Sequence, residues 1–171
     1  MEKIMRPTAA AMVEEGCAFC GVLYGGLMKT PNGIKVIEFN ARFGDPETEV
    51  VLPRLQSDAV DVFMAVANNE QPTTEWSKEA TLGIVLASKG YPGSYDKGFA
   101  IRGTERVDAK IFHMGTARKD GELVTAGGRV MIVVASAPSL EEALKKARKE
   151  IANIECDNLF HRTDIGAKAF R

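Results

Sequence analysis

The chain has 171 residues, of which 45% are hydrophobic and 26% charged, and its formal net charge is −1. This length predicts one domain or two small ones, with enough apolar residues for a real core. The near-neutral charge gives no electrostatic argument for binding nucleic acid or an anionic membrane surface. The sequence has no apolar run of membrane-spanning length, no signal-peptide pattern, and three cysteines without framework spacing. We therefore expect a protein of the cytoplasm.

The first forty residues predict a helix followed by a hairpin. Residues 5–15 are rich in alanine and end at a glycine, which is typical of a helix. The apolar residues between 19 and 28 predict a buried strand. Asn32-Gly33 is the strongest short-range signal for a hairpin turn, and a second strand is expected at residues 34–39. The two strands should therefore pair antiparallel.

The most informative stretch is Glu-Phe-Asn-Ala-Arg-Phe-Gly-Asp-Pro-Glu at residues 38–47. Side chains alternate along a strand, so Glu38, Asn40 and, if the strand extends so far, Arg42 should share one face. The intervening side chains should point into a core: Phe39, Ala41 and Phe43. A carboxylate and an amide oxygen suit Mg²⁺, which takes one or two protein ligands together with phosphates and water. Taken alone, however, a Glu-x-Asn pair is more often a solvated strand end, and Asp45 can simply cap a helix.

The following segment predicts two short helices and then a boundary. Residues 46–55 should be helical with an interruption near Pro53, and Ser57 can cap the next helix. Four apolar residues of that helix fall at core-facing spacing: Val60, Phe63, Met64 and Ala67. Residues 68–78 are polar and contain a proline, so we expect a domain boundary there.

The second half changes to strands separated by glycine turns. Strands are expected at residues 81–87, 98–101, 111–114, 123–126 and 129–135, with a hairpin tip at Lys119-Asp120-Gly121. Ser139 and Glu142 have capping-box spacing and should open a helix. Its apolar face is expected to contain Leu140, Ala143, Leu144, Ala147 and Ile151. The pattern predicts a small mixed α/β domain with antiparallel strands.

Two cysteines and two histidines could in principle bind metal or react, but we interpret all four as structural or surface residues. Cys17 and Cys20 have C-x-x-C spacing, but a zinc site needs two more ligands, and Cys156, His113 and His161 are scattered. A redox pair is expected at a helix N-terminus, whereas this one follows a helix end. Buried cysteines and structural or surface histidines are therefore favoured.

Two glycine-rich segments have two readings each. The first is Gly90-Tyr91-Pro92-Gly93, a simple turn or a loop whose backbone approaches a substrate. The second is Gly127-Gly128-Arg129, a turn with a solvated arginine or an anion site of backbone amides and a guanidinium. Glycine turns are common, so the residues alone favour the structural reading.

Residues 38–47 resemble the signature of phosphoribosylamine–glycine ligase, also called glycinamide ribonucleotide synthetase, an ATP-grasp ligase of de novo purine synthesis. Further segments resemble that family in its order: 21–28, 86–93, 127–130 and 162–166. The resemblance covers essentially the whole chain but less than half of the family's usual length. It implies an α/β (α+β) fold class, with the distal piece of an ATP-grasp domain at residues 1–78. A small C-terminal domain is implied at residues 79–171.

The resemblance also implies a reaction. Glycine's carboxylate attacks the γ-phosphate of ATP, and the amine of phosphoribosylamine then displaces phosphate from the glycyl phosphate. Glu38 and Asn40 are implied to hold Mg²⁺ or Mn²⁺ at the ATP phosphates, with Arg42 and, less strongly, Asp45 as catalytic candidates. The family's C-terminal domain closes over the ribose phosphate, so substrate contacts are implied at both glycine-rich segments: Gly90, Tyr91, Pro92, Gly93, Gly127, Gly128 and Arg129.

The resemblance limits what this chain is expected to do alone. Most ATP contacts of the family lie in upstream segments, and residues 21–28 contain none of the acidic ligands found there in many ATP-grasp enzymes. The missing N-terminal lobes are therefore the expected partner, and the 171-residue chain alone should be inactive. Two alternatives remain: a non-catalytic binding module that kept the fold, and another carboxylate–amine ligase of the superfamily.

Overall fold

The computed structural model describes residues 2–170; Met1 and Arg171, the outer bounds of the expected domains, lie outside the described residues. The chain is mixed α/β with antiparallel sheets, as the sequence predicted, and it packs as two compact units. One unit contains the residues up to Thr48 together with Leu55–Trp76, and the other contains Glu49–Arg54 and the residues from Ser77 onward. Within residues 2–170, no helix is long and apolar enough to cross a membrane.

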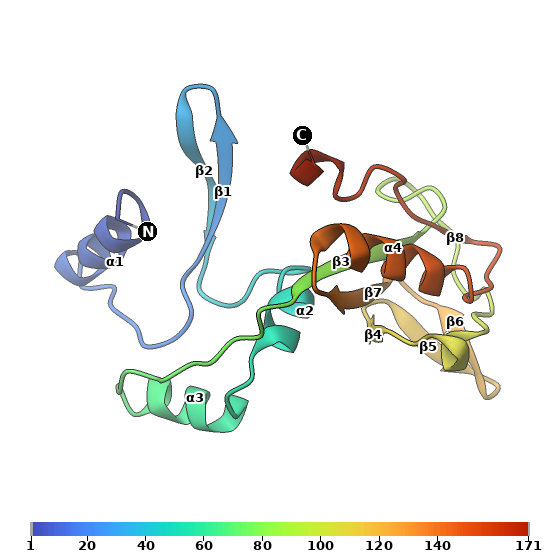
Figure 1. Cartoon of the computed structure of the whole chain (residues 1–171), viewed down its shortest axis with the longest axis horizontal. Helices are drawn as coiled ribbons and strands as arrows, with labels where there is room; N and C mark the ends of the chain where they lie inside the picture. The colour runs from blue at the N-terminus through green and yellow to red at the C-terminus, as the bar shows by residue number, and fades with distance from the viewer. Residues whose placement is uncertain (1, 171) are drawn as a thin grey trace. The chain divides into compact units, whose positions relative to one another are not determined.

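The N-terminal unit contains two helices and one hairpin (Figure 1). Helix α1 spans Met5–Glu14, strands β1 and β2 span Tyr24–Thr30 and Gly33–Asn40, and helix α3 spans Ala59–Ala67. The strands pair antiparallel, which confirms the expected hairpin. The register places Tyr24 opposite Asn40 and Gly26 opposite Glu38, with an irregularity between Gly26 and Leu27.

The expected burial of this unit is wrong. Gly44 is its only buried residue among those described. Phe39 is 41% exposed, Ala41 is exposed, and the supposedly buried strand contains exposed Leu27 and Met28. The apolar face of α3 is likewise open at Val60, Phe63 and Met64. A two-stranded sheet and two short helices have too little area to enclose a core. The alternating apolar side chains therefore share one face of a strand, but that face is not buried.

The start of α3 also differs from the sequence prediction. Asp58, not Ser57, is the N-cap: its carboxylate accepts hydrogen bonds from the backbone of Val60 at 2.7 Å and Asp61 at 3.3 Å. Ser57 instead accepts a bond from the backbone of Glu75 at 2.7 Å. Both serine and aspartate are good caps, so spacing alone did not separate two adjacent candidates.

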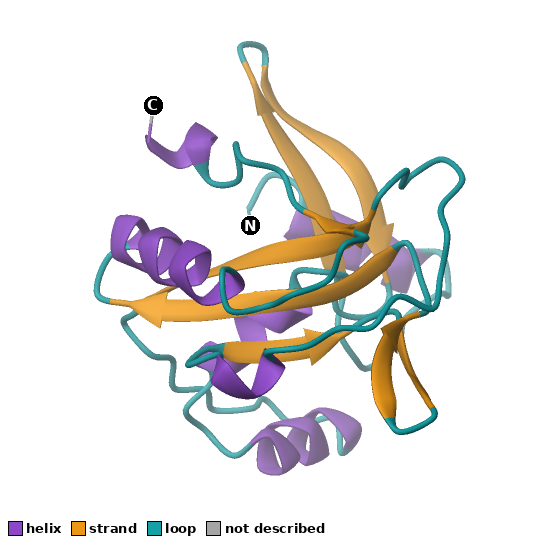
Figure 2. Ribbon diagram, turned by 90° about the vertical axis from the view of Figure 1, so that its right-hand side faces the viewer, coloured by secondary structure: helices purple, strands orange, loops and turns teal. Residues whose placement is uncertain are grey.

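The C-terminal unit is built on a four-stranded antiparallel sheet in the order β4-β7-β3-β8. The strand bounds are β3 Ala80–Ser88, β4 Lys110–His113, β7 Arg129–Ala137 and β8 Leu159–Phe160. A separate hairpin joins β5, Thr116–Lys119, to β6, Glu122–Thr125. Strand β5 was not predicted, and residues 98–101 form no strand but a single bridge between Ala100 and Val124. Figure 2 draws these strands in orange.

Both faces of the β3–β7 pair are covered. Leu82 and Ile84 pack against helix α4, Leu140–Ile151, which is held at its start by the expected Ser139–Glu142 capping box. On the opposite face, a Cβ built at Gly83 would lie 2.8 Å from Cγ1 of Val50 and 2.6 Å from Cδ1 of Ile132. Val50 belongs to helix α2, Thr48–Val51, which continues into the 3-10 turn Leu52–Arg54. The segment Glu49–Arg54 therefore covers the sheet face that α4 leaves open.

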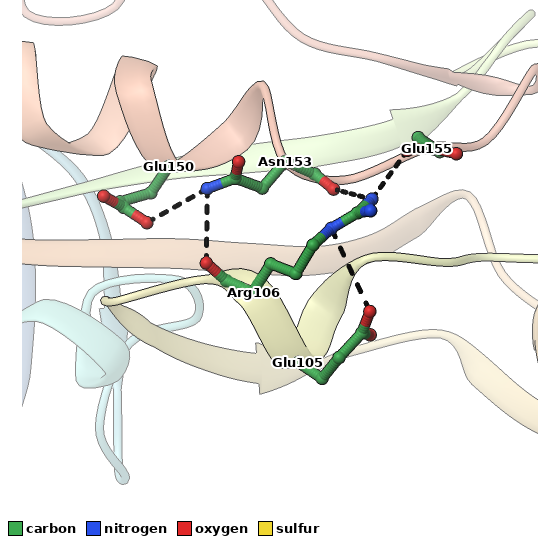
Figure 3. Close-up of polar contacts among 5 residues, drawn as sticks. All are labelled: Glu105, Arg106, Glu150, Asn153 and Glu155. Atoms are coloured by element: carbon green, nitrogen blue, oxygen red, sulfur yellow. Dashed lines mark hydrogen bonds and ion pairs between the residues drawn. The ribbon is translucent and has the colours of Figure 1, made fainter.

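A buried carboxylate ties the end of α4 to the loop before β4 (Figure 3). Glu150 is 4% exposed and accepts a hydrogen bond from the backbone N–H of Asp108 at 2.7 Å. Asn153 donates to the same carboxylate at 3.4 Å and to the carbonyl of Arg106 at 3.3 Å. Arg106 in turn donates to the Asn153 carbonyl at 3.1 Å and to Glu155 at 2.6 Å.

We predict that Glu150→Ala destabilises the C-terminal unit by about 1–3 kcal/mol, because the part-buried hydrogen bond from the N–H of Asp108 to the buried carboxylate would be lost. Glu150→Gln keeps one acceptor oxygen and should cost less. Lys145→Ala, an exposed position of the same helix, is the control. Chemical denaturation provides the measurement, and equal unfolding midpoints for Glu150→Ala and Lys145→Ala would contradict the role given to the carboxylate.

The two units also predict a proteolysis pattern. Residues 74–76 are held by the Leu55–Trp76 bridge and the Ser57–Glu75 bond, whereas residues 68–71 and 73 are exposed. Limited protease should therefore cut first between Asn68 and Thr73. Because Glu49–Arg54 packs with the C-terminal unit, the two fragments should stay associated on gel filtration and separate only in denaturant. Early cuts within β3 or β7, or fragments that separate under native conditions, would contradict this organisation.

Candidate active site

The end of β2 brings Glu38 and Asn40 together. The Asn40 side-chain amide donates to the Glu38 carboxylate at 2.9 Å, so the two side chains lie on one face of the strand. Glu38 is exposed and Asn40 half-buried. A Cβ built at Gly26, directly across the hairpin, would lie 3.1 Å from Cγ of Glu38. Glycine at this position leaves room for the glutamate side chain beside the partner strand.

The donor set fits a hard divalent cation. Glu38 offers a carboxylate oxygen and Asn40 an amide oxygen, which are ligand types that Mg²⁺ and Mn²⁺ accept. Within residues 2–170 no group of three His, Cys, Asp or Glu side chains is placed to hold a metal ion. A cation held by these two residues would take its other ligands from phosphate oxygens and water, as Mg²⁺ commonly does.

The loop after β2 gives Arg42 and Asp45 different surroundings from those expected. The strand ends at Asn40, and Arg42 donates to the carbonyl of its neighbour Phe43 at 2.8 Å. Arg42 was expected on the face of Glu38 and Asn40 only if the strand extended that far, and this condition is not met. Asp45 is exposed and precedes a cis peptide bond to Pro46, and the helix begins only at Thr48. Both side chains remain within the motif loop, adjacent in sequence to the Glu38–Asn40 pair.

Sequence reasoning missed two further residues of this site, Tyr24 and Glu47. A Cβ built at Gly44 would lie 2.5 Å from Oε2 of Glu47 and 3.0 Å from Cζ of Tyr24, so both side chains converge on this buried glycine. The pKa of Tyr24 is raised, and burial is the largest cause. The smaller causes are, in order, the negative charge of Glu47, the hydrogen bond between Glu47 and the phenol, and the charge of Glu38. The available signals were the position of Tyr24 opposite Asn40 in the expected hairpin and Glu47 as the last residue of the motif.

We predict that Tyr24 titrates above the ordinary tyrosine pKa of 10.0. The folded state binds this proton more tightly than the unfolded state, so the associated stability is present below pH 10 and is lost as pH rises through the raised pKa. Tyrosinate absorbance checks this: Tyr24→Phe should remove a transition above the ordinary range, and Glu47→Gln should move that transition down. A Tyr24 transition within the ordinary range would contradict the packing described here.

The structure brings the two glycine-rich segments of the C-terminal unit together. Ser88 is fully buried at the end of β3: its N–H donates to the Gly128 carbonyl at 2.8 Å and its hydroxyl to the Gly127 carbonyl at 2.9 Å. The ring of Tyr91 packs directly where a Cβ of Gly128 would be. Ser88 was not singled out from the sequence, and a small polar residue ending a buried strand was its only signal.

Packing already explains part of the glycine content of these segments. Gly127 lies against the backbone of Gly115, which leaves little room for side chains on either residue. Tyr91 also makes an edge contact with Tyr95, whose ring lies under the Lys97 ammonium at 5.8 Å. Gly90, Pro92 and Gly93 form the adjoining turn, and Arg129 begins β7 beside it. The structure thus places all seven candidate substrate residues in one neighbourhood of this unit.

The remaining cysteine and histidine candidates do not assemble into a site. Cys17 and Cys20 are exposed thiols, which corrects the expectation that they are buried, and Cys20 lies 3.1 Å from the side-chain oxygen of Asn69. The segment that contains them lies outside the helices and strands, and its residues are exposed. His113 shares a hydrogen bond of 3.0 Å with Thr116 across the turn between β4 and β5.

Comparisons with known proteins give the chain its relatives. The family model described as phosphoribosylglycinamide synthetase, C domain, matches residues 81–168, more than half of the chain. The chain belongs to the phosphoribosylglycinamide synthetase family. The model for the ATP-grasp (A) domain of the same synthetase matches residues 1–48. The motif that contains Glu38 and Asn40 thus lies within the ATP-grasp match.

Individual members of the phosphoribosylglycinamide synthetase family are similar over nearly all of the chain. The phosphoribosylamine–glycine ligase of Halalkalibacterium halodurans is 52% identical over 99% of the chain, and that of Listeria innocua is 49% identical over 99%. The crystal structure of the Thermotoga maritima ligase matches 92% of the chain with a TM-score of 0.81 and 34% identity. The chain spans only 40% to 41% of these proteins' own length.

Proposed function

We propose that this chain is the C-terminal part of an ATP-dependent phosphoribosylamine–glycine ligase, which joins glycine to 5-phosphoribosylamine with release of ADP and phosphate. The observation that carries the proposal is the Glu38–Asn40 pair at the end of β2, within the segment matched by the ATP-grasp domain. The chemistry requires a carboxylate to attack the γ-phosphate and an amine then to displace phosphate from glycyl phosphate. Such phosphoryl transfer depends mainly on positioning and charge neutralisation.

Each part of the chain has a role in this proposal. Glu38 and Asn40 would hold Mg²⁺ or Mn²⁺ together with the ATP phosphates, and such an ion would supply positive charge for phosphoryl transfer. Arg42 stabilises the transferred phosphoryl group or holds a substrate anion, and Asp45, in the same loop, is the second and weaker catalytic candidate. Residues 1–78 form the distal ATP-grasp piece and residues 79–171 the C-terminal domain, with the segment Glu49–Arg54 of the first packed into the second. The remaining lobes of the ligase supply most contacts to ATP.

The glycine-rich neighbourhood of the C-terminal unit is the proposed contact for the ribose phosphate of phosphoribosylamine. Its backbone comes from two segments, Gly90–Gly93 and Gly127–Arg129, that Ser88 holds together. Arg129 contributes a guanidinium, which suits a phosphate because it can donate two parallel hydrogen bonds. Fixed backbone and one cation at the start of a strand make a suitable cradle for an anion.

A chimera provides the test of function. These 171 residues would replace the aligned portion of the Halalkalibacterium halodurans ligase, to which they are 52% identical. We expect glycine-dependent ADP release by the chimera and none by the 171-residue chain alone. An inactive but folded chimera would favour the alternative of a binding module without catalysis. Activity of the chain alone would contradict the need for the remaining lobes.

In the active chimera, we predict that Glu38→Ala and Asn40→Ala reduce turnover by at least about 100-fold and 10-fold, because they remove metal ligands. The free energy of unfolding should change by only about 1 kcal/mol, since neither side chain is buried. Higher Mg²⁺ should rescue Asn40→Ala better than Glu38→Ala, which also loses a charge. Lys35→Ala, an exposed change in the same strand, is the control; wild-type turnover in Glu38→Ala would refute the metal assignment.

A further inference from the structure

Three side chains share one face of the β1–β2 hairpin near its polar end. Tyr24 lies opposite Asn40, and Gly26 lies opposite Glu38. Directly opposite residues of an antiparallel pair present their side chains on the same face, as do residues two apart in one strand. Tyr24 is therefore on the face that contains Glu38 and Asn40. With glycine at position 26, the side chain across from Glu38 is absent, and the phenol is the large group that borders the pair on β1.

Glu47 reaches this face from the loop that follows β2. Its carboxylate and the Tyr24 ring both lie against Gly44, at 2.5 Å and 3.0 Å from the position that a Cβ would take. Gly44 also accepts bonds at its carbonyl from the backbone and hydroxyl of Thr48, at 3.0 Å and 2.5 Å. The loop thus closes on itself around a buried glycine, and the Tyr24–Glu47 contact connects it to the first strand.

We propose that Tyr24 and Glu47 form a positioning pair, which fixes the motif loop against β1 and so holds Glu38 and Asn40 in the geometry that binds a divalent cation. This inference rests on the proposed role of Glu38 and Asn40 as ligands. Neither member of the pair contacts the cation. The Tyr24 hydroxyl donates a hydrogen bond to the Glu47 carboxylate, so in this proposal that carboxylate holds the loop and does not bind the metal.

The geometry favours such a role because the ligand pair has little other support. Glu38 is exposed and accepts a hydrogen bond from Asn40, which is itself the last residue of its strand. A strand end of a two-stranded sheet frays easily unless a further contact holds it. Groups that orient metal ligands from outside the coordination shell commonly change metal affinity by about 10–100-fold when removed.

The test uses the chimera of these 171 residues with the Halalkalibacterium halodurans ligase, loaded with ADP and titrated with Mn²⁺ by electron paramagnetic resonance. Tyr24→Phe and Glu47→Gln should each raise the Mn²⁺ dissociation constant about 10-fold. The Mn²⁺ dissociation constant of the double variant should be no higher than that of the single variant that binds Mn²⁺ less tightly, because the two residues act as one unit. Glu70→Gln, an exposed glutamate of the same unit, should bind Mn²⁺ like the wild type.

The outcomes separate this proposal from the function on which it rests. Weaker binding in Glu47→Gln but not in Tyr24→Phe would make Glu47 a direct ligand and overturn the pair, as would additive losses in the double variant. Wild-type affinity in both variants, or unfolding of both in a thermal melt, would also overturn it. A wild-type chimera that binds Mn²⁺ but releases no ADP would contradict only the proposed function. A wild-type chimera that binds no Mn²⁺ would refute both.

Discussion

Backbone pairing of Tyr24 with Asn40 and of Gly26 with Glu38 determines which side chains meet at the polar end of the hairpin. A slip of one residue would turn Glu38 and Asn40 to the opposite face, where Phe39 now lies near Gly25. Register in most sheets is specified by a buried apolar face, yet this hairpin has no buried side chain among its described residues. The Asn32-Gly33 turn and the contacts around Gly44 therefore have an unusually large share in setting it.

The two units differ in how their stability is distributed. In the C-terminal unit, β7 is almost completely buried, and α4 and the segment Glu49–Arg54 cover the two faces of the β3–β7 pair. The N-terminal unit has ordered strands and helices but exposes most of its large apolar side chains. Such exposure is typical of surfaces that contact other protein, and it agrees with a chain that spans about 40% of its relatives.

Much of the fold followed from local sequence signals, whereas burial and the supporting contacts did not. Asn32-Gly33 and the Ser139–Glu142 box specify structure over a few residues, and both are present as expected. Burial of Phe39 depends on what lies above it, which alternation cannot reveal. The Glu38–Asn40 pair could be predicted because it lies two residues apart on one strand. Tyr24 and Glu47 are separated from each other by more than twenty residues, so their contact required the hairpin register.

The placement of Glu49–Arg54 has a consequence for recombination among related genes. The match to the ATP-grasp domain ends at residue 48 and that to the C domain begins at residue 81, so the interval between them resembles a free linker. The packing of Val50 over Gly83 shows that its first residues are part of the C-terminal unit. A crossover after residue 54 would combine a β3 strand from one parent with the segment Glu49–Arg54, which packs over that strand, from another. A crossover just before Glu49 keeps both from one parent, and shuffled libraries joined there should retain more folded members.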